Sequence, residues 1–108
     1  MINIADFEKV ELRIGRIMEV NDVENARKPL YRLGIDLGEL GSRQIVAGIK
    51  GQYSKEELLG KSILCVVNLE PKAVAGIESQ GMLLAAEDDS RLSLIIPEKD
   101  VAAGSTVH

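Results

Sequence analysis

The stretch that decides the fold is residues 66–86, which read Val66-Val67-Asn68-Leu69-Glu70-Pro71-Lys72-Ala73-Val74-Ala75-Gly76-Ile77-Glu78-Ser79-Gln80-Gly81-Met82-Leu83-Leu84-Ala85-Ala86. An apolar strand ends at Asn68, and a second apolar strand begins at Met82. The polar insert between them, residues 68–80, is much longer than a usual hairpin loop of about two to five residues. We therefore expect the insert to be a recognition loop, which the rest of the chain holds in place.

Short alternating or apolar segments, separated by glycine and polar turns, predict a chain made mainly of strands. The longest, residues 10–20, loses its alternation at Gly15-Arg16. This predicts a bulge there, because an extra residue shifts the pleat. Residues 30–37 alternate regularly, with Tyr31 expected inward and Arg32 outward. The remaining expected strands are residues 43–49, 62–67, 82–86 and 92–96.

One short helix is expected between the third and fourth strands. Ser54 can cap its free N–H groups, Glu57 can complete a capping box, and Gly60 can provide the left-handed stop. The first five of these strands, with a single helix between the third and the fourth, predict an all-β protein with the OB-fold, a five-stranded Greek-key barrel. Ligands of that fold bind on strands 2 and 3 and on the loops 1–2 and 4–5, here residues 21–29 and 68–80.

Length and composition favour one soluble, cytoplasmic domain, residues 1–108. The net charge of −4 argues against general polyanion binding, yet residues 9–61 carry ten Lys or Arg against eight Asp or Glu. A locally basic face is therefore expected on an acidic protein. The single cysteine, Cys65, excludes an internal disulfide and fits a reducing cytoplasm. We expect no signal peptide and no membrane partner, because no apolar run approaches the ~20 residues of a membrane helix.

Catalysis is not expected from these residues. The only histidine is His108, at the end of the sequence, so no Ser/His or Cys/His pair is expected on a rigid element. Cys65 lies within an apolar strand and is expected to be a core residue. No Cys or His cluster has the spacing of a metal site, and no phosphate-binding glycine loop is present. The sequence predicts a binding protein without a metal or another cofactor, rather than an enzyme.

Scattered cations suggest an RNA-binding face. The candidates are Arg13, Arg27, Lys28, Arg32, Arg43 and Lys72. Arg32 and Arg43 are expected to point outward from the second and third strands, and the basic residues should converge with Ser79 on one face. Because aromatic residues are only 3%, recognition of a folded RNA through phosphates and 2′-hydroxyls is favoured over base stacking. The alternative, that each cation is a solubilising charge offset by a nearby glutamate, stays open.

Two motifs carry a resemblance to a known family. The first is Phe7-Glu8-Lys9-Val10-Glu11-Leu12-Arg13-Ile14-Gly15-Arg16-Ile17. The second is Asn68-Leu-x-Pro71-Lys72 followed by Gly76-x-x-Ser79-x-Gly81-Met82. They resemble the tRNA-binding domain at the C-terminus of many methionyl-tRNA synthetases. That domain also occurs in free-standing dimeric tRNA-binding proteins and in the endothelial monocyte-activating polypeptide group. The similarity extends over nearly the whole chain.

The resemblance implies a homodimer with structure-specific tRNA binding that is largely independent of sequence. It implies tRNA contacts at Asn68, Lys72, Ser79 and Met82. It also implies dimer contacts from the terminal segments, including about residues 87–108. By this resemblance the chain is expected to act in trans as a cofactor of methionyl-tRNA synthetase, in the manner of a β subunit.

Two departures from the family pattern suggest a second function. Family members usually carry more basic residues after the proline, where this chain has Ala73 and Ala75. Losing cations lowers the affinity for phosphate and its salt dependence. The first-loop segment, residues 23–29, is more similar to CsaA-type secretion chaperones, a dimeric branch that binds unfolded peptides. The alternative function is therefore a CsaA-type peptide chaperone.

Overall fold

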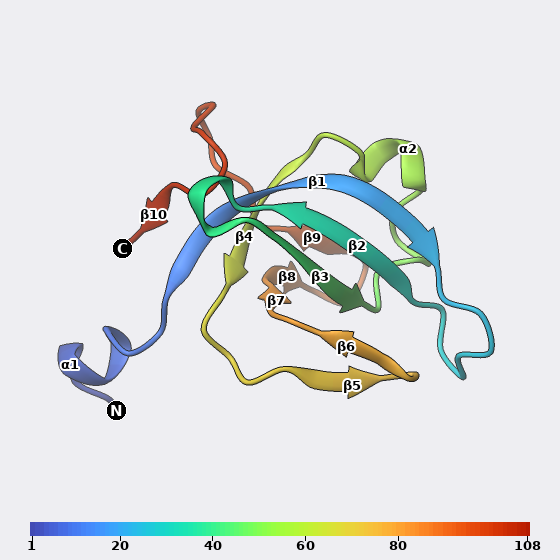
Figure 1. Cartoon of the computed structure of the whole chain (residues 1–108), viewed down its shortest axis with the longest axis horizontal. Helices are drawn as coiled ribbons and strands as arrows, with labels where there is room; N and C mark the ends of the chain where they lie inside the picture. The colour runs from blue at the N-terminus through green and yellow to red at the C-terminus, as the bar shows by residue number, and fades with distance from the viewer.

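The computed structural model describes all 108 residues and shows one antiparallel sheet that curls into a barrel (Figure 1). In spatial order its five main strands are β3 (Ser42–Ala47), β2 (Tyr31–Asp36), β1 (Leu12–Asp22), β4 (Ser62–Val66) and β7 (Met82–Leu83). A sixth, short strand, β10 (Thr106–Val107), also pairs with β1. The predicted all-β, OB-like barrel is confirmed.

Two hairpins and three short helical turns complete the chain. The hairpins are β5 (Lys72–Val74) with β6 (Ile77–Ser79) and β8 (Ala85–Glu87) with β9 (Leu92–Leu94). The helical turns are α1 (Ile4–Phe7), the 3-10 turn η1 (Gly38–Leu40) and α2 (Lys55–Leu58). The predicted strand 82–86 is divided into β7 and β8, because its first half pairs with β4 and its second half with β9. No helix is both long and apolar enough to span a membrane.

The core fills the inside of the barrel with aliphatic side chains. Along β2 and just beyond it, Tyr31, Leu33, Ile35 and Leu37 are buried, while the residues between them are half-buried. This confirms the predicted alternation of the second strand. Side chains from the other strands and from α2 complete the core, among them Ile17, Ile45, Leu58, Ile63, Cys65 and Leu94.

The bulge of β1 lies at Met18, so its predicted position at Gly15-Arg16 is wrong. The register against β2 shifts between Ile17 and Glu19, which leaves Met18 as the extra residue. Gly15 serves another purpose, because a Cβ atom there would collide with Cγ2 of Ile35 and lie 3.0 Å from Leu37 Cδ2. The glycine therefore makes room inside the barrel, where neighbouring strands come close together.

The helix α2 has the capping predicted from its sequence. The hydroxyl of Ser54 accepts from the backbone N–H of Glu57 at 3.2 Å, and the Glu57 carboxylate accepts from the N–H of Ser54 at 2.9 Å. Gly60 follows in the left-handed region with φ of 84°. Leu58 is completely buried, so the helix closes one part of the core.

Residues 68–80 are not the long open loop that was expected. The insert folds back on itself as the hairpin of β5 and β6, in which Val74 pairs with Ile77. Its two turn residues, Ala75 and Gly76, have φ of 50° and 82°, as a two-residue turn of type I′ requires. The pairing of β5 with β6 gives backbone groups of the insert hydrogen-bond partners within the insert, which explains how so long a connection is maintained.

The C-terminal segment lies along the edge of β1 that faces away from β4. Ile14 donates its backbone N–H to the carbonyl of Ser105 at 2.9 Å, and Gly104 donates to the carbonyl of Ile14 at 2.7 Å. Ile14 is consequently buried outside the main core. At the other end of the chain, α1 projects away from the barrel (Figure 1) and has no buried residue.

Candidate nucleic-acid interface

Arg32 lies on the outer face of β2, as predicted, and three neighbouring side chains hold it. Its Nε donates to Oε1 of Gln44 at 2.9 Å. Its Nη1 donates to Oε2 of Glu19 at 3.0 Å and to Oδ1 of Asn21 at 3.2 Å. Arg32, Glu19 and Gln44, together with Gln80, border a polar depression of about 400 Å³ on the outside of β1, β2 and β3. A guanidinium held in this way presents its remaining N–H groups in a fixed direction, which suits a phosphate.

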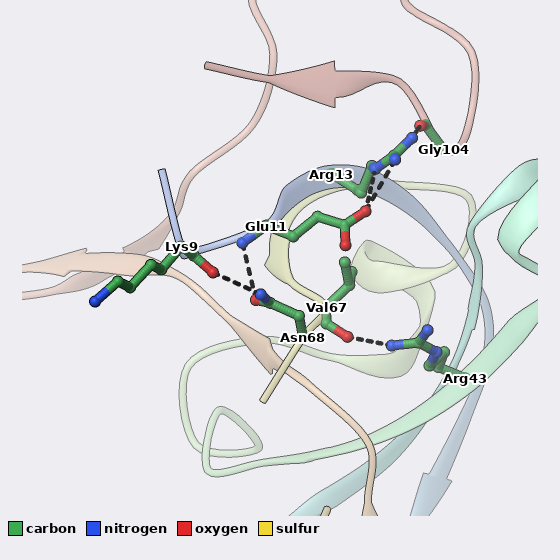
Figure 2. Close-up of polar contacts among 7 residues, drawn as sticks. All are labelled: Lys9, Glu11, Arg13, Arg43, Val67, Asn68 and Gly104. Atoms are coloured by element: carbon green, nitrogen blue, oxygen red, sulfur yellow. Dashed lines mark hydrogen bonds and ion pairs between the residues drawn. The ribbon is translucent and has the colours of Figure 1, made fainter. Parts of the chain in front are cut away.

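The expectation that Arg43 points outward is wrong. Arg43 lies opposite the buried Ile35 in the register, and it shares a face of β3 with the buried Ile45, two residues further along. Residues directly opposite each other share a face of the sheet, so Arg43 starts from the inner face. Its guanidinium donates to the carbonyl of Val67 just beyond β4 (Figure 2). Arg43 still borders the same depression as Arg32.

Asn68 uses its side-chain amide within the chain. Its Oδ1 accepts from the backbone N–H of Glu11 at 2.8 Å, and its Nδ2 donates to the carbonyl of Lys9 at 2.7 Å. Figure 2 shows Asn68 between these two residues. The amide therefore fastens the segment before β1 to the end of β4, and both of its polar atoms are occupied.

Arg13 lies beside the C-terminal segment rather than on the face of β2 and β3. Its Nε and Nη2 contact Oε2 of Glu11 at 3.0 Å and 2.9 Å. Its Nη1 donates to the carbonyl of Gly104 at 2.9 Å. Figure 2 shows the guanidinium between Glu11 and Gly104. This arginine thus connects the start of β1 to the C-terminal segment.

Ser79 is buried, with only 7% of its surface exposed. Its hydroxyl accepts from the backbone N–H of Val46 at 3.0 Å and donates to the carbonyl of Gly81 at 3.4 Å. Beside it, Gln80 donates its backbone N–H to the carbonyl of Gln44 at 2.8 Å. These bonds attach β6 to β3, so the serine hydroxyl is not available to a ligand in this arrangement.

Lys72 and Met82 are exposed and border a trough between the hairpin and β3. The trough has a volume of about 510 Å³ and is walled by Val46, Leu69 and Val74. The ammonium of Lys72 makes no ion pair within the chain, and 45% of Met82 is exposed. The trough can accept an apolar group of a ligand, and Lys72 can attract a negative charge beside that group.

Arg27 and Lys28 are exposed in the loop between β1 and β2, and neither makes an ion pair. At the base of the loop, Asp22 contacts Nζ of Lys55 at 2.8 Å and Nζ of Lys50 at 2.9 Å. Hydrogen bonds from Lys55 and then Lys50 hold the pKa of the Asp22 carboxyl below its usual range. The sequence did not single out these two lysines, because their carboxylate partner lies far away in the chain, at the end of β1.

The residues expected on one face fall into three groups. Arg32 and Arg43 border the polar depression, while Lys72 and Ser79 belong to the hairpin. Arg13 lies with the terminal segments. The sequence analysis also missed Glu19, Gln44 and Gln80. The unusual glycine within an alternating strand, Gly34, was the available signal for Glu19, since such glycines mark a close approach.

Metal-ligating side chains and the thiol of Cys65 are the remaining groups to be placed. No group of three or more His, Cys, Asp or Glu side chains could hold a metal ion. Burial raises the pKa of the Cys65 thiol to about 11, so it stays protonated and unreactive at neutral pH. The surface presents separate exposed cations and one largely apolar trough.

Comparison with known proteins agrees with a binding role. A family model described as "Putative tRNA binding domain" matches residues 12–106. A methionine–tRNA ligase from Methanococcus maripaludis is 48% identical over 108 residues, which cover 100% of this chain but 16% of the ligase. The chain is therefore similar to one segment of a much longer protein.

Solved structures are similar over the whole chain. A CsaA chaperone protein from Picrophilus torridus has a TM-score of 0.93 and 36% identity, with 100% of both chains covered. A MetRS related protein from Pyrococcus horikoshii has a TM-score of 0.90 and 36% identity, covering 100% of this chain and 98% of that one.

Proposed function

The chain belongs to the tRNA-binding domain family, and from this membership we propose that it binds folded tRNA without catalysing a reaction. The observation that carries the proposal is the family match over residues 12–106, which takes in nearly the whole barrel. With a net charge of −4, the protein gains little from general attraction to phosphates, so its contacts must be local. Double-helical RNA exposes phosphates and 2′-hydroxyls along a wide, shallow groove, which suits separate cations.

Internal bonding divides the nine candidate residues between two roles. Direct contact is assigned to Arg27, Lys28, Arg32, Lys72 and Met82. Four of these side chains are exposed. The fifth, Arg32, is half-buried but keeps an unused N–H donor. A positioning role is assigned to Arg13, Arg43, Asn68 and Ser79. Their side chains hold the hairpin, the end of β4, the segment before β1 and the C-terminal segment in place.

We also propose that two copies associate through their terminal segments. In the single chain Ile2, Ile4 and Phe7 are exposed around α1. An apolar depression of about 370 Å³, bordered by Ile96 and Val101 among others, lies at the C-terminal segment. Covering these surfaces in a dimer removes apolar area from water. Two weak tRNA sites in one dimer bind more tightly if one tRNA reaches both.

The partner proposed in trans is methionyl-tRNA synthetase, because the chain is 48% identical to a segment of a methionine–tRNA ligase. In this role the dimer holds tRNA and raises its local concentration at the enzyme. Such a role places the protein in the cytoplasm, where tRNA is charged.

A second candidate function is binding of unfolded peptides, in the manner expected of a CsaA-type chaperone. The similarity to the Picrophilus torridus chaperone, with a TM-score of 0.93, favours it. So does the trough beside Met82, whose apolar walls can take a peptide side chain. The loss of cations at Ala73 and Ala75 favours it as well, since a peptide site needs fewer positive charges.

Binding of folded tRNA across a salt series tests the first function. We expect binding at low salt that weakens as salt increases, because each phosphate contact releases counterions. Lys72→Ala should lower the affinity and reduce the slope of log K against log salt by roughly 0.7–0.9. Lys99→Ala is the matched control, since Lys99 is also exposed and makes no ion pair. It should leave the slope unchanged.

The same samples decide between the two functions. Unfolded peptides are titrated in parallel, with displacement by tRNA as the readout. Failure to bind tRNA even at low salt, together with peptide binding, would exclude the first function in favour of the second. Equal slopes for Lys72→Ala and the wild type would remove Lys72 from the proposed contacts.

A further inference from the structure

The polar depression on β1, β2 and β3 contains donors and acceptors that the fold does not use. Arg32 donates Nε and Nη1 to neighbouring side chains, while its Nη2 makes no hydrogen bond within the chain. Ser42 and Gln80 border the same depression. The hydroxyl of Ser42 and the side-chain amino group of Gln80 also have no partner in the protein. These unused donors surround a space of about 400 Å³, which is large enough for a phosphate group.

An intramolecular anion stands beside these donors. The Glu19 carboxylate contacts Nη1 of Arg32 at 3.0 Å. The Glu19 side chain is 64% exposed, compared with 31% for Arg32. The carboxylate therefore lies on the solvent side of a half-buried guanidinium, in the path that an incoming anion would take.

Two backbone features place Glu19 there. The bulge at Met18 turns Glu19 outward together with its neighbour, instead of alternating inward. Gly34 lies opposite Glu19 in the register, and a Cβ at Gly34 would approach Cβ of Glu19 to 3.2 Å. The bulge and the glycine together let the carboxylate lie flat over β2 and reach Arg32.

The ion pair is not needed to hold Arg32 in position. Gln44 accepts from Nε and Asn21 accepts from Nη1, so two neutral side chains already orient the guanidinium. Exposed ion pairs also contribute little to stability. What Glu19 adds to these bonds is therefore mainly its negative charge.

We propose that Glu19 is a specificity-determining residue, whose carboxylate occupies Arg32 as an intramolecular substitute for a phosphate of the RNA backbone. The inference rests on the proposed tRNA-binding function. A polyanion that touches only this depression must displace Glu19 and then lie beside its charge. A folded tRNA that is also held by Lys72, Arg27 and Lys28 offsets this cost. Glu19 thus weakens the binding of unmatched polyanions more than the binding of folded tRNA.

Glu19→Gln tests the proposal, because it removes the charge and keeps the shape. We expect the affinity for heparin, a polyanion without RNA structure, to rise about tenfold, and the affinity for tRNA to rise only about twofold to threefold. Glu39→Gln is the matched control, because Glu39 is exposed, makes no ion pair and lies outside the depression. It removes the same net charge and should change either affinity by less than about twofold.

A double-mutant cycle identifies Arg32 as the group on which Glu19 acts. In an Arg32→Gln background, Glu19→Gln should raise the affinity for heparin no more than Glu39→Gln does. Denaturation midpoints of all variants show whether each remains folded. If Glu19→Gln and Glu39→Gln raise the affinity for heparin equally while tRNA still binds, the specificity role of Glu19 is wrong and the tRNA-binding function stands. If the wild type binds no tRNA at low salt, the proposed function fails, and the inference fails with it.

Discussion

Gly15 shows how the size of a single side chain limits the packing of the barrel interior. Gly15 faces the interior, where Ile35, Leu37 and Cys65 meet, and each of these three is at most 1% exposed. The alternation of the sequence suggested a bulge at this glycine, but β1 continues straight through it and the bulge comes at Met18. A glycine in a strand can mark either a bulge or a close approach of neighbours. Only the packing around it distinguishes the two.

Gly15→Ala is therefore expected to destabilise the fold by about 1–3 kcal/mol, because a methyl group in a filled core forces its neighbours to shift. Gly48→Ala is the control, since the nearest neighbour of a Cβ there, Leu30 Cδ2, is 3.7 Å away. Urea denaturation of both variants gives the comparison. If Gly15→Ala lowers the free energy of unfolding no more than Gly48→Ala does, the packing role of Gly15 is contradicted.

Among the elements, the hairpin of β5 and β6 depends most on contacts outside itself. Two short strands and a two-residue turn are marginal alone. Side chains provide two of the bonds that attach them to β3, because the Ser79 hydroxyl accepts from the N–H of Val46 and the Gln80 side chain accepts from the N–H of Gln44. A backbone bond from Gln80 to the carbonyl of Gln44 adds to these. Lys72 lies directly opposite Ser79 in the hairpin. The buried serine therefore determines where the exposed lysine is presented.

Ser79→Ala is expected to lower the free energy of unfolding by about 1–2 kcal/mol, because the N–H of Val46 loses its partner. Amide hydrogen exchange at Val46 should become faster, while exchange in β1 and β4 should not. Ser93→Ala is the control, since Ser93 is exposed and its hydroxyl makes only a long contact of 3.5 Å with Leu94. Unchanged exchange at Val46 would show that the hydroxyl does not hold the hairpin.

At the scale of the whole molecule, the C-terminal segment packs against the barrel, whereas the N-terminal turn does not. The C-terminal segment is fitted onto it, since Cβ atoms at Gly38 and Gly104 would strike the carbonyls of Ala103 and Leu37. The N-terminal turn α1 instead extends into solvent with 72% of Ile4 and 41% of Phe7 exposed (Figure 1). An apolar arm of this kind is expected to be covered by another molecule.

If two copies of the wild type associate as proposed, the double variant Ile4→Ser with Phe7→Ser is expected to be monomeric at the same concentration. Analytical ultracentrifugation measures the mass directly. The denaturation midpoint of the variant at low concentration should match that of the wild-type monomer, because neither side chain is buried in the single chain. Leu40→Ser with Leu59→Ser is the control, as both leucines are exposed elsewhere, and it should stay dimeric. A monomeric wild type would contradict the proposed association.

The sequence by itself determined what depends on neighbours along the chain. The alternation of β2, the capping box at Ser54 and the aliphatic core follow from local periodicity and short-range hydrogen bonds, and all three are confirmed. The barrel with one helix between β3 and β4 followed from the order of these segments. These features were predictable because strand pleat and helix capping act over a few residues.

Only the tertiary structure decided which polar side chains remain free for a ligand. Asn68 reaches Glu11 across 57 positions of sequence and Arg43 reaches Val67 across 24, so their partners could not be seen in a local pattern. The same holds for Ser79, which the packing of β6 on β3 buries. The sequence identified the residues of the insert 68–80, but the fold separated those that hold it from those, such as Lys72, that face solvent. The physical reason is that a hydrogen bond or an ion pair depends on distance in space, which strand pairing sets between residues far apart in the chain.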